Sequence, residues 1–334
     1  MRTPVLMLLG MLLLTPAANA IAAPERPPSA ADSGVSAVVP STRQFDFKST
    51  INGHTYRVQV AMPFVPAPPS GYAALYVLDG DGYFGTYSFA ARMRAMLGEV
   101  QPAVVVGIGY PEAESDMKVA LVRRQYDLTP TQIDPKEAAQ TGLATDPSAL
   151  GGADTFLQVI EREVKPRVAA LLPVDSSRDI LFGHSLGGLF ALHTLFTHPE
   201  SFRTYLVLSP SIWFNHGVVL KNEATFTAAV KSGKVSPRVF VAVGGEEEKP
   251  PAVLPPGMTR EQVAKSITEA AMVRNTRDLG DRLKALPSTA GYASRARVFD
   301  GETHISVAWA SVVPFLDFAL APEKPQSSSE STAR

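Results

Sequence analysis

The sequence of 334 residues contains no cysteine. This absence excludes disulfide bonds, thiol catalysis and cysteine-ligated metals, and it excludes a lipoprotein, which needs a cysteine to acylate. Charge is scarce as well, since charged residues make up 19% of the chain where about 25% is usual. The 31 basic and 32 acidic residues leave a net charge of −1. Nucleic acid is therefore not an expected partner, because binding it requires an excess of basic residues.

Apolar runs long enough to cross a membrane are missing too. The run Val5–Leu14 has ten residues, whereas a membrane-spanning helix needs about 20. It follows Arg2 and precedes Ala18-Asn19-Ala20, which puts small residues at the two positions that a signal peptidase reads. We predict a signal peptide over residues 1–20, cleaved after Ala20. The mature protein is then periplasmic or secreted, with no stable insertion into the membrane.

Two further segments lack the apolar periodicity of folded elements. Residues 21–43 are rich in proline, alanine and serine, which predicts a flexible leader. Residues 322–334 are polar and predict a disordered tail. We expect one folded domain between them, over residues 44–321.

The central part of the chain alternates between strand and helix patterns. Asn52-Gly53 separates two strand patterns, around 45–47 and 56–60, and predicts an antiparallel hairpin. Short, continuous apolar runs follow, which are typical of parallel strands buried on both faces by helices. The predicted strands are 73–78, 103–108, 179–182, 205–208, 239–243 and 293–299, and the predicted helices are 83–97, 154–172, 186–196, 260–286 and 305–320. This order predicts an α/β fold with a mixed, mostly parallel sheet and helices on both faces.

Two connections are longer than usual. Residues 111–152 follow a predicted strand, and residues 246–259 follow another and contain two Pro-Pro pairs. Connections of this length are typical of lids and binding loops.

The motif Gly183-His184-Ser185-Leu186-Gly187 carries the clearest chemical signal. It follows a predicted strand and opens a predicted helix, which is the setting of the nucleophile elbow of serine hydrolases. Glycine is needed on both sides of the serine because the backbone is crowded there. The helix N-terminus beneath the serine also favours negative charge on an attacked carbonyl. We predict that Ser185 is the catalytic nucleophile.

Six histidines are available as the base that activates this serine. In this fold the chain order is serine, acid and then histidine. His304 fits that order, because it lies between the last predicted strand, 293–299, and the final helix. The other histidines lie inside the elbow, on or just after the next helix, in the hairpin, or before the strand expected to carry the acid. We predict that His304 is the catalytic base.

The acid that orients this base should follow the strand 239–243, where Glu246, Glu247 and Glu248 stand. Such an acid fixes the tautomer of the histidine and stabilises its protonated form. Spacing alone does not decide among the three. Glu247 is the first choice and Glu248 the second.

An oxyanion hole needs two backbone N–H donors. Leu186, directly after the nucleophile, is expected to supply one, and Asp81, in the turn after the strand 73–78, the other. The same turn opens the sequence Gly80-Asp81-Gly82-Tyr83-Phe84-Gly85, nominally a dinucleotide-binding motif. No acidic residue ends a second strand about 20 positions further on, as that motif requires. We predict no cofactor and no metal, since no His, Asp and Glu residues have metal-ligand spacing.

Five segments together resemble the bacterial siderophore esterases, relatives of the enzymes that open the enterobactin and salmochelin trilactones. They are residues 78–84, 124–130, 183–188, 209–213 and 301–304. The resemblance implies the α/β-hydrolase fold and an esterase family, with Ser185 as nucleophile and His304 as base. Some periplasmic relatives work with a Ser–His dyad, so it stays open whether a glutamate takes part.

The resemblance also implies contacts with the substrate. Trp213 and Phe214 resemble part of the wall that holds an acyl or aryl group. Arg124 occupies a position that could meet an anionic substrate, and an internal ion pair is the alternative.

We therefore expect an exported serine carboxylic-ester hydrolase with an acyl-enzyme on Ser185. Its substrate is a small-molecule ester, with a ferric or iron-free siderophore as one candidate. The first alternative is another serine acyl hydrolase or acyltransferase of the same fold, such as a carbohydrate esterase or a formylglutathione-hydrolase-like enzyme. The second is a non-catalytic binding protein, which would normally have lost Ser185 or His304.

Overall fold

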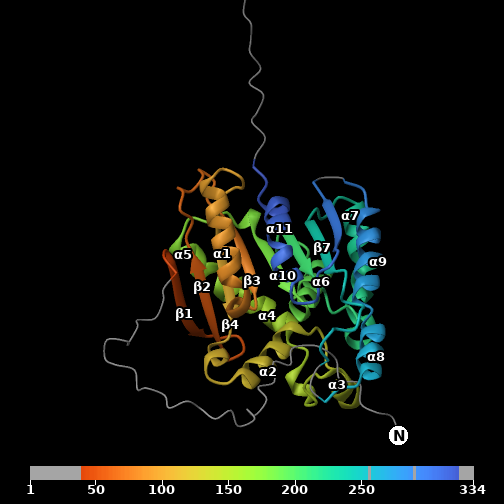
Figure 1. Cartoon of the computed structure of the whole chain (residues 1–334). Coiled ribbons are helices and arrows are strands. Elements are labelled where there is room, and N and C mark those ends of the chain that lie inside the picture. Colours follow the sequence, from red (N-terminus) through yellow and green to blue (C-terminus); the bar gives the residue numbers. More distant parts are fainter. Residues whose placement is uncertain (1–38, 255–256, 289–290, 323–334) are drawn as a thin grey trace, which may run out of the picture.

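The computed structural model describes residues 39–254, 257–288 and 291–322 (Figure 1). The predicted signal peptide, residues 21–38 of the predicted leader and residues 323–334 of the predicted tail lie outside the described residues. The first strand begins at Thr42, so the last two residues assigned to the leader belong to the folded domain. Within the ranges described, no helix is both long and apolar enough to span a bilayer.

An eight-stranded sheet forms the centre of the molecule, in the order β1-β2-β4-β3-β5-β6-β7-β8. β2 is antiparallel to both β1 and β4, and the other neighbouring strands are parallel. The strands are β1 Thr42–Lys48, β2 Thr55–Ala61, β3 Ala73–Leu78, β4 Ala103–Gly109, β5 Ile180–His184, β6 Thr204–Leu208, β7 Arg238–Gly244 and β8 Ala293–Phe299. The predicted mixed sheet with an N-terminal hairpin is confirmed, and the predicted parallel strands agree with these bounds to within two residues.

Helices cover both faces of the sheet (Figure 1). α1 (Gly80–Met96) and α11 (Val312–Ala319) pack on one face, where their apolar side chains join those of the buried strands. The other face is covered by α2 Met117–Leu128, α3 Pro135–Thr141, α4 Ala153–Val159, α5 Lys165–Leu171, α6 Leu186–Thr197, α7 Glu223–Lys231 and α9 Met272–Lys284. Burial on both faces explains why the central strands are apolar throughout rather than alternating.

Three predicted helices are interrupted. The predicted helix 260–286 consists of α8 (Arg260–Ala270) and α9, because Ala271 adopts a left-handed φ of 44°. A π-helical turn at 160–164 separates α4 from α5, and the last predicted helix divides into α10 (Val307–Ala310) and α11. Each of these interruptions leaves the apolar pattern almost unchanged, so the sequence does not reveal it.

The long connection 111–152 is largely helical. It contains α2 and α3, whose first turns are capped by the carboxylates of Asp116 and Asp134. α2 carries three charged side chains that reach into the body of the protein: Arg124, which contacts Asp79, and Arg123 and Asp127, which contact Tyr56.

Candidate active site

Ser185 stands between β5 and α6 on a turn with a strained backbone. Its φ is 62° and its ψ −117°, a combination that residues other than glycine rarely adopt. A Cβ on Gly183 would lie 2.0 Å from the carbonyl oxygen of Gly187, and a Cβ on Gly188 would lie 2.7 Å from that of Leu208. Glycine is therefore required at Gly183, the first glycine of the motif, and at Gly188, directly after the motif. The turn holds Ser185 at the N-terminus of α6, where it is 4% exposed.

The turn after β3 lies against the start of α6. Asp79 in that turn has a φ of 53°, and its Oδ2 lies 3.5 Å from the place where a Cβ on Gly187 would be. The expected oxyanion donors are the first residue of α6, Leu186, and the second residue of α1, Asp81. N–H groups in the first turn of a helix have no carbonyl partner inside the helix, so they are suited to bind an oxyanion. The carboxylate of Asp81 is occupied separately, since it accepts from the N–H of Tyr110 at 3.0 Å.

His304 and Glu247 meet where the loops after β7 and β8 approach each other. Nδ1 of His304 lies 2.7 Å from Oε2 of Glu247. Oε1 of Glu247 accepts from the hydroxyl of Ser209 at 2.5 Å and from the backbone N–H of Gly244 at 2.7 Å. A Cβ on Gly244 would lie 2.4 Å from the carbonyl oxygen of Glu302, so only glycine lets the two loops come this close. The carboxylate favours the tautomer of His304 that carries its proton on Nδ1 and leaves Nε2 free to accept one.

The two neighbouring glutamates make other contacts. Glu248 is exposed and accepts from the backbone N–H of Arg274 at 2.8 Å. Glu246 forms an ion pair with Lys249 at 2.7 Å. The structure therefore brings the first-choice acid to His304 and leaves the second choice apart from it.

The ring of His184 packs against the ring of His304, with 4.5 Å between their centroids. Nδ1 of His184 lies 2.8 Å from the hydroxyl of Tyr83. Burial, followed by the charges of His304 and Arg124, holds the pKa of His184 well below its ordinary value. His184 thus stays neutral, and its contact with His304 places that ring beside the elbow that carries Ser185.

Two residues of this cluster received no role from the sequence. Ser209 follows β6, the strand between the nucleophile strand and the acid strand, and it is fully buried with a φ of 42°. Its position at the carboxyl end of that strand is the sequence signal that could have indicated a role in the site. Tyr83 lies on the first turn of α1, and nothing in its spacing indicates that its hydroxyl meets His184.

The residues expected to contact substrate differ in where they lie. Arg124 donates two hydrogen bonds to the carboxylate of Asp79, at 2.6 and 2.8 Å, so the internal ion pair is present. Trp213 is partly buried and packs against a small apolar cluster that includes Ala270. Phe214 is 0% exposed inside the main core, so it does not reach a substrate in this conformation.

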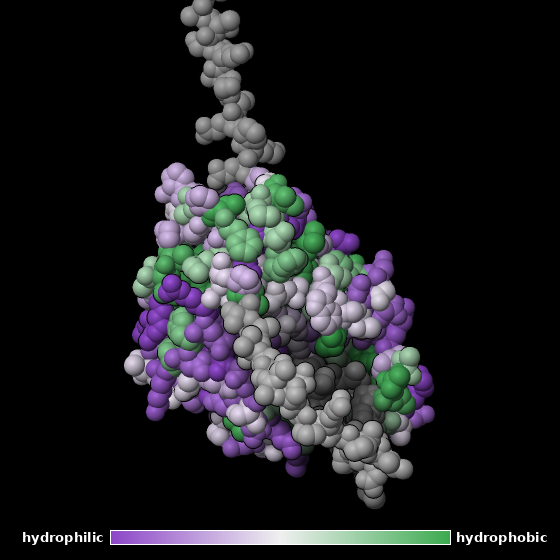
Figure 2. Space-filling model, turned by 60° about the vertical axis from the view of Figure 1, so that its left-hand side comes forward, coloured by the Kyte–Doolittle hydropathy of each residue, from purple (hydrophilic) through white to green (hydrophobic). Residues whose placement is uncertain are grey.

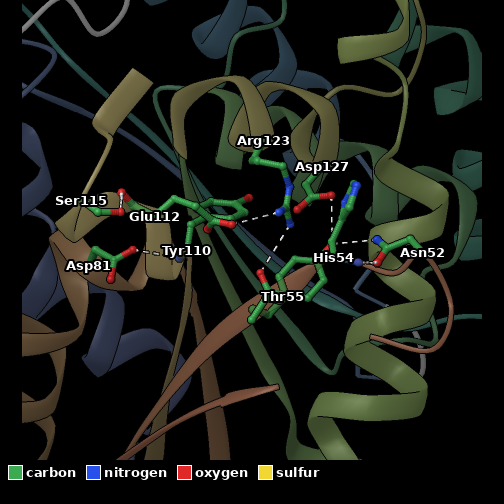
Figure 3. Close-up of polar contacts among 10 residues, drawn as sticks. Asn52, His54, Thr55, Asp81, Tyr110, Glu112, Ser115, Arg123 and Asp127 are labelled. Atoms are coloured by element: carbon green, nitrogen blue, oxygen red, sulfur yellow. Dashed lines mark hydrogen bonds and ion pairs between the residues drawn. The ribbon is translucent and has the colours of Figure 1, made fainter. Parts of the chain in front are cut away.

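A second buried polar cluster lies between α2, β2 and the end of β4 (Figure 3). Asp127 accepts a hydrogen bond from the hydroxyl of Tyr56 at 3.1 Å, and the guanidinium of Arg123 lies 5.5 Å from the centre of the Tyr56 ring. Burial raises the pKa of Asp127 to about 7, although Arg123, Tyr56 and Tyr110 each lower it. Figure 3 shows Arg123 and Asp127 projecting from the same helix into this cluster.

Outside these two clusters, the described residues show a surface of mixed polarity (Figure 2) and no group of metal ligands. Figure 2 shows hydrophobic side chains gathered toward the upper end of that view and interspersed with hydrophilic ones. Phe89, in the middle of α1, and Leu97, directly after it, are among the most exposed apolar residues. In the part of the chain that the structure describes, no three His, Asp or Glu side chains are grouped as a metal site.

A strained serine after β5, a carboxylate after β7 and a histidine after β8 occupy the positions in which serine hydrolases of the α/β-hydrolase fold carry nucleophile, acid and base. The chain belongs to the family described as "Putative esterase", whose sequence pattern matches residues 49–277. It is therefore a serine carboxylic-ester hydrolase, and both the fold and the family expected from the sequence are confirmed.

Curated relatives agree with this assignment over most of the chain. The chain is 34% identical to the ferri-bacillibactin esterase BesA of Bacillus subtilis, over 87% of this chain and 93% of that protein. It is 34% identical to the siderophore triacetylfusarinine C esterase of Aspergillus fumigatus, over 82% and 91% of the two chains. The crystal structure of the BES protein from Bacillus cereus superposes with a TM-score of 0.72 and 32% identity, over 86% and 99% of the two chains.

Proposed function

We propose that this protein is an exported esterase that hydrolyses the ester bonds of siderophores through an acyl-enzyme on Ser185. The observation that carries the proposal is the hydrogen bond between His304 and the buried Glu247, beside a serine on a strained elbow. The relatives that match most of the chain are named as siderophore esterases, which supports this substrate class. Export rests on the sequence of residues 1–20, which lie outside the described part of the chain.

In the first half of the reaction, Oγ of Ser185 attacks the ester carbonyl while Nε2 of His304 accepts the hydroxyl proton. The negative oxygen of the tetrahedral intermediate binds the N–H groups of Leu186 and Asp81. His304 then donates its proton to the oxygen of the departing alcohol, and the acyl group stays on Ser185. Glu247, bound to Nδ1 of His304, stabilises the imidazolium that exists between these two proton transfers.

In the second half, water replaces the alcohol. His304 accepts a proton from the water, whose oxygen attacks the acyl carbon, and the collapse of the second intermediate returns the proton to Oγ of Ser185. The products are a carboxylic acid and an alcohol, and no redox partner or metal is needed to balance either step.

Arg124 acts here as a positioning residue rather than a substrate ligand. Its two hydrogen bonds to Asp79 hold the turn that carries the Asp81 N–H against the start of α6. Trp213 supports the wall of the site through the apolar cluster that includes Ala270.

The test is hydrolysis by the purified mature protein of ferric and iron-free catecholate trilactones, compared with aryl acetates and acetylated sugars. We expect the highest kcat/KM with a siderophore ester and none with Ser185→Ala. Hydrolysis of aryl acetates or sugar acetates with no turnover of any siderophore ester would reject the substrate class and keep the esterase. Unchanged turnover by Ser185→Ala would reject the site itself.

A further inference from the structure

A cavity of about 390 Å³ opens beside the catalytic base. One wall is the loop after β7 with Glu247, another is the loop after β8 with His304 and Ile305, and the third is α8 with Ile267 and Ala270. Ligand pockets in proteins start at about 300 Å³, and a cavity of about 150 Å³ already holds a benzene ring. This cavity is therefore large enough for a substituted aromatic or bicyclic group.

The position of the cavity relative to the reacting groups indicates which part of an ester it would take. His304 and Glu247 line it, whereas Ser185 is not among the described residues that do. During acyl transfer the acyl group becomes bonded to the serine, and the histidine delivers its proton to the oxygen of the departing alcohol. The alcohol portion consequently leaves from the side of the imidazole.

The lining defines the chemistry of the group that fits. Ile267, Ala270 and Ile305 supply apolar surface from two different walls. Three charged residues of the loop line the cavity. Glu246 and Lys249 form an ion pair with each other, and the carboxylate of Glu247 is bound to Ser209, Gly244 and His304, so none of the three is free to pair with a charged ligand. A neutral apolar or aromatic group is favoured over an anion or a cation.

We infer that this cavity is the subsite for the alcohol portion of the ester and that it selects a bulky, neutral, apolar or aromatic group there. The inference rests on the proposed function, since it assumes Ser185 as nucleophile and His304 as base. Ile267 is the specificity-determining residue, because it lies on α8 in the cavity wall and is only partly buried, so a larger side chain can enter the cavity without displacing the core.

The experiment changes the size of the cavity by mutation and measures how kcat/KM depends on the size of the alcohol portion of the ester. Ile267→Trp narrows the cavity and Ile267→Ala widens it, while Thr268→Trp adds the same bulk to an exposed neighbour on α8 outside the lining. Each variant is compared with the wild type on the same ester, so that intrinsic ester reactivity cancels. One series is ethyl, phenyl and 2-naphthyl acetate, and the other is phenyl acetate, butyrate and benzoate.

We expect Ile267→Trp to lower kcat/KM for 2-naphthyl acetate by about tenfold or more, as one side chain in an apolar pocket does. Ethyl acetate should change by less than about threefold, and Ile267→Ala should shift the preference toward 2-naphthyl acetate. Thr268→Trp should change neither series. Equal losses across the alcohol series, losses that follow the acyl series, or the same losses in Thr268→Trp would each overturn the inference. These results are distinguishable from failure of the proposed function, because they are measured on simple esters that any active form hydrolyses.

Discussion

Glu247 and Asp127 are two buried carboxyl groups that the fold surrounds with different partners. Glu247 faces three polar partners, the Ser209 hydroxyl, the Gly244 N–H and the His304 ring. Asp127 accepts from the Tyr56 hydroxyl, while the nearest cation, Arg123, lies over aromatic rings. Burial consequently raises the pKa of Asp127 to about 7.

The difference shows what a buried carboxylate needs in order to serve a neighbouring base. Donors that are supplied by the backbone and by a fixed hydroxyl favour the negative charge, so that the carboxylate can hold the proton of His304 in place. A carboxyl group with fewer donors retains its own proton near neutral pH. Glu247 is therefore equipped to act through His304, whereas Asp127 affects the stability of the fold.

The first prediction concerns Ser185 and His304, the proposed nucleophile and base. Ser185→Ala and His304→Ala should each lower kcat by a factor of about 10⁴ or more, because nucleophile and base act as one unit. Asp127→Asn should keep kcat within about threefold of the wild type, since surface or core changes remote from a reacting group act mainly on stability. Steady-state hydrolysis of phenyl acetate by the folded variants checks this. A loss of kcat in Asp127→Asn comparable with that in His304→Ala would contradict the assignment of Glu247 to catalysis and of Asp127 to stability.

The second prediction separates a triad from a dyad. Glu247→Gln should lower kcat by about 10- to 10³-fold, less than the roughly 10⁴-fold loss in a well-studied triad. Because Glu246 and Glu248 contact Lys249 and Arg274 instead, neither replaces it, and the triple Glu→Gln variant should match Glu247→Gln. Glu248→Gln is the matched control and should retain wild-type kcat. Wild-type rates in the triple variant would show that Ser185 and His304 work as a dyad.

The sequence predicts the strands and turns that carry this site better than the side-chain contacts within it. The mixed sheet with its hairpin, the elbow and the place of His304 follow from strand patterns and from the spacing of Gly183, Ser185 and Gly187, because backbone crowding at Gly183 excludes other residues. Ser209 and Tyr83 were missed because their roles depend on distances across strands that are far apart in the sequence. Phe214 was expected to line the site and is buried, since its neighbour Trp213 occupies the more exposed position.

The third prediction follows from the raised pKa of Asp127. Between about pH 4 and 7 the folded protein holds a proton on Asp127 that the unfolded chain has released, so this group lowers the free energy of unfolding as the pH rises. A shift of roughly three pH units corresponds to at most about 4 kcal/mol. Asp127→Asn keeps an acceptor for Tyr56 and should be more stable than the wild type at pH 8 by about 1–4 kcal/mol, with the difference vanishing near pH 4.

Urea unfolding at pH 4, 6 and 8 measures this difference. Asp154→Asn is a control for the opposite sign, because the hydrogen bond from His193 lowers the pKa of Asp154. Its effect should be a loss of stability that is present at pH 6 and 8 and largely retained at pH 4, because the contribution of Asp154 is lost only as the pH falls through its lowered pKa in the folded protein. A constant stability difference between Asp127→Asn and the wild type from pH 4 to 8 would contradict the prediction.

The smallest expected effect tests the support of Glu247 itself, with two serines two residues apart. Ser209 and Ser211 are both fully buried, but the Ser209 hydroxyl donates to Glu247, whereas the Ser211 hydroxyl has no hydrogen-bond partner among the described residues. Ser209→Ala removes one of three partners and should lower kcat by about 3- to 10-fold, the kinetic equivalent of one hydrogen bond. Ser211→Ala removes an unpaired buried hydroxyl and should leave kcat unchanged, with stability equal to or above that of the wild type. A merely structural role for Ser209 would lower stability without changing the pH profile of kcat, whereas a role through Glu247 changes that profile, because it alters how well the imidazolium of His304 is stabilised. Equal pH profiles for the wild type and both alanine variants would show that the Gly244 N–H suffices to hold Glu247.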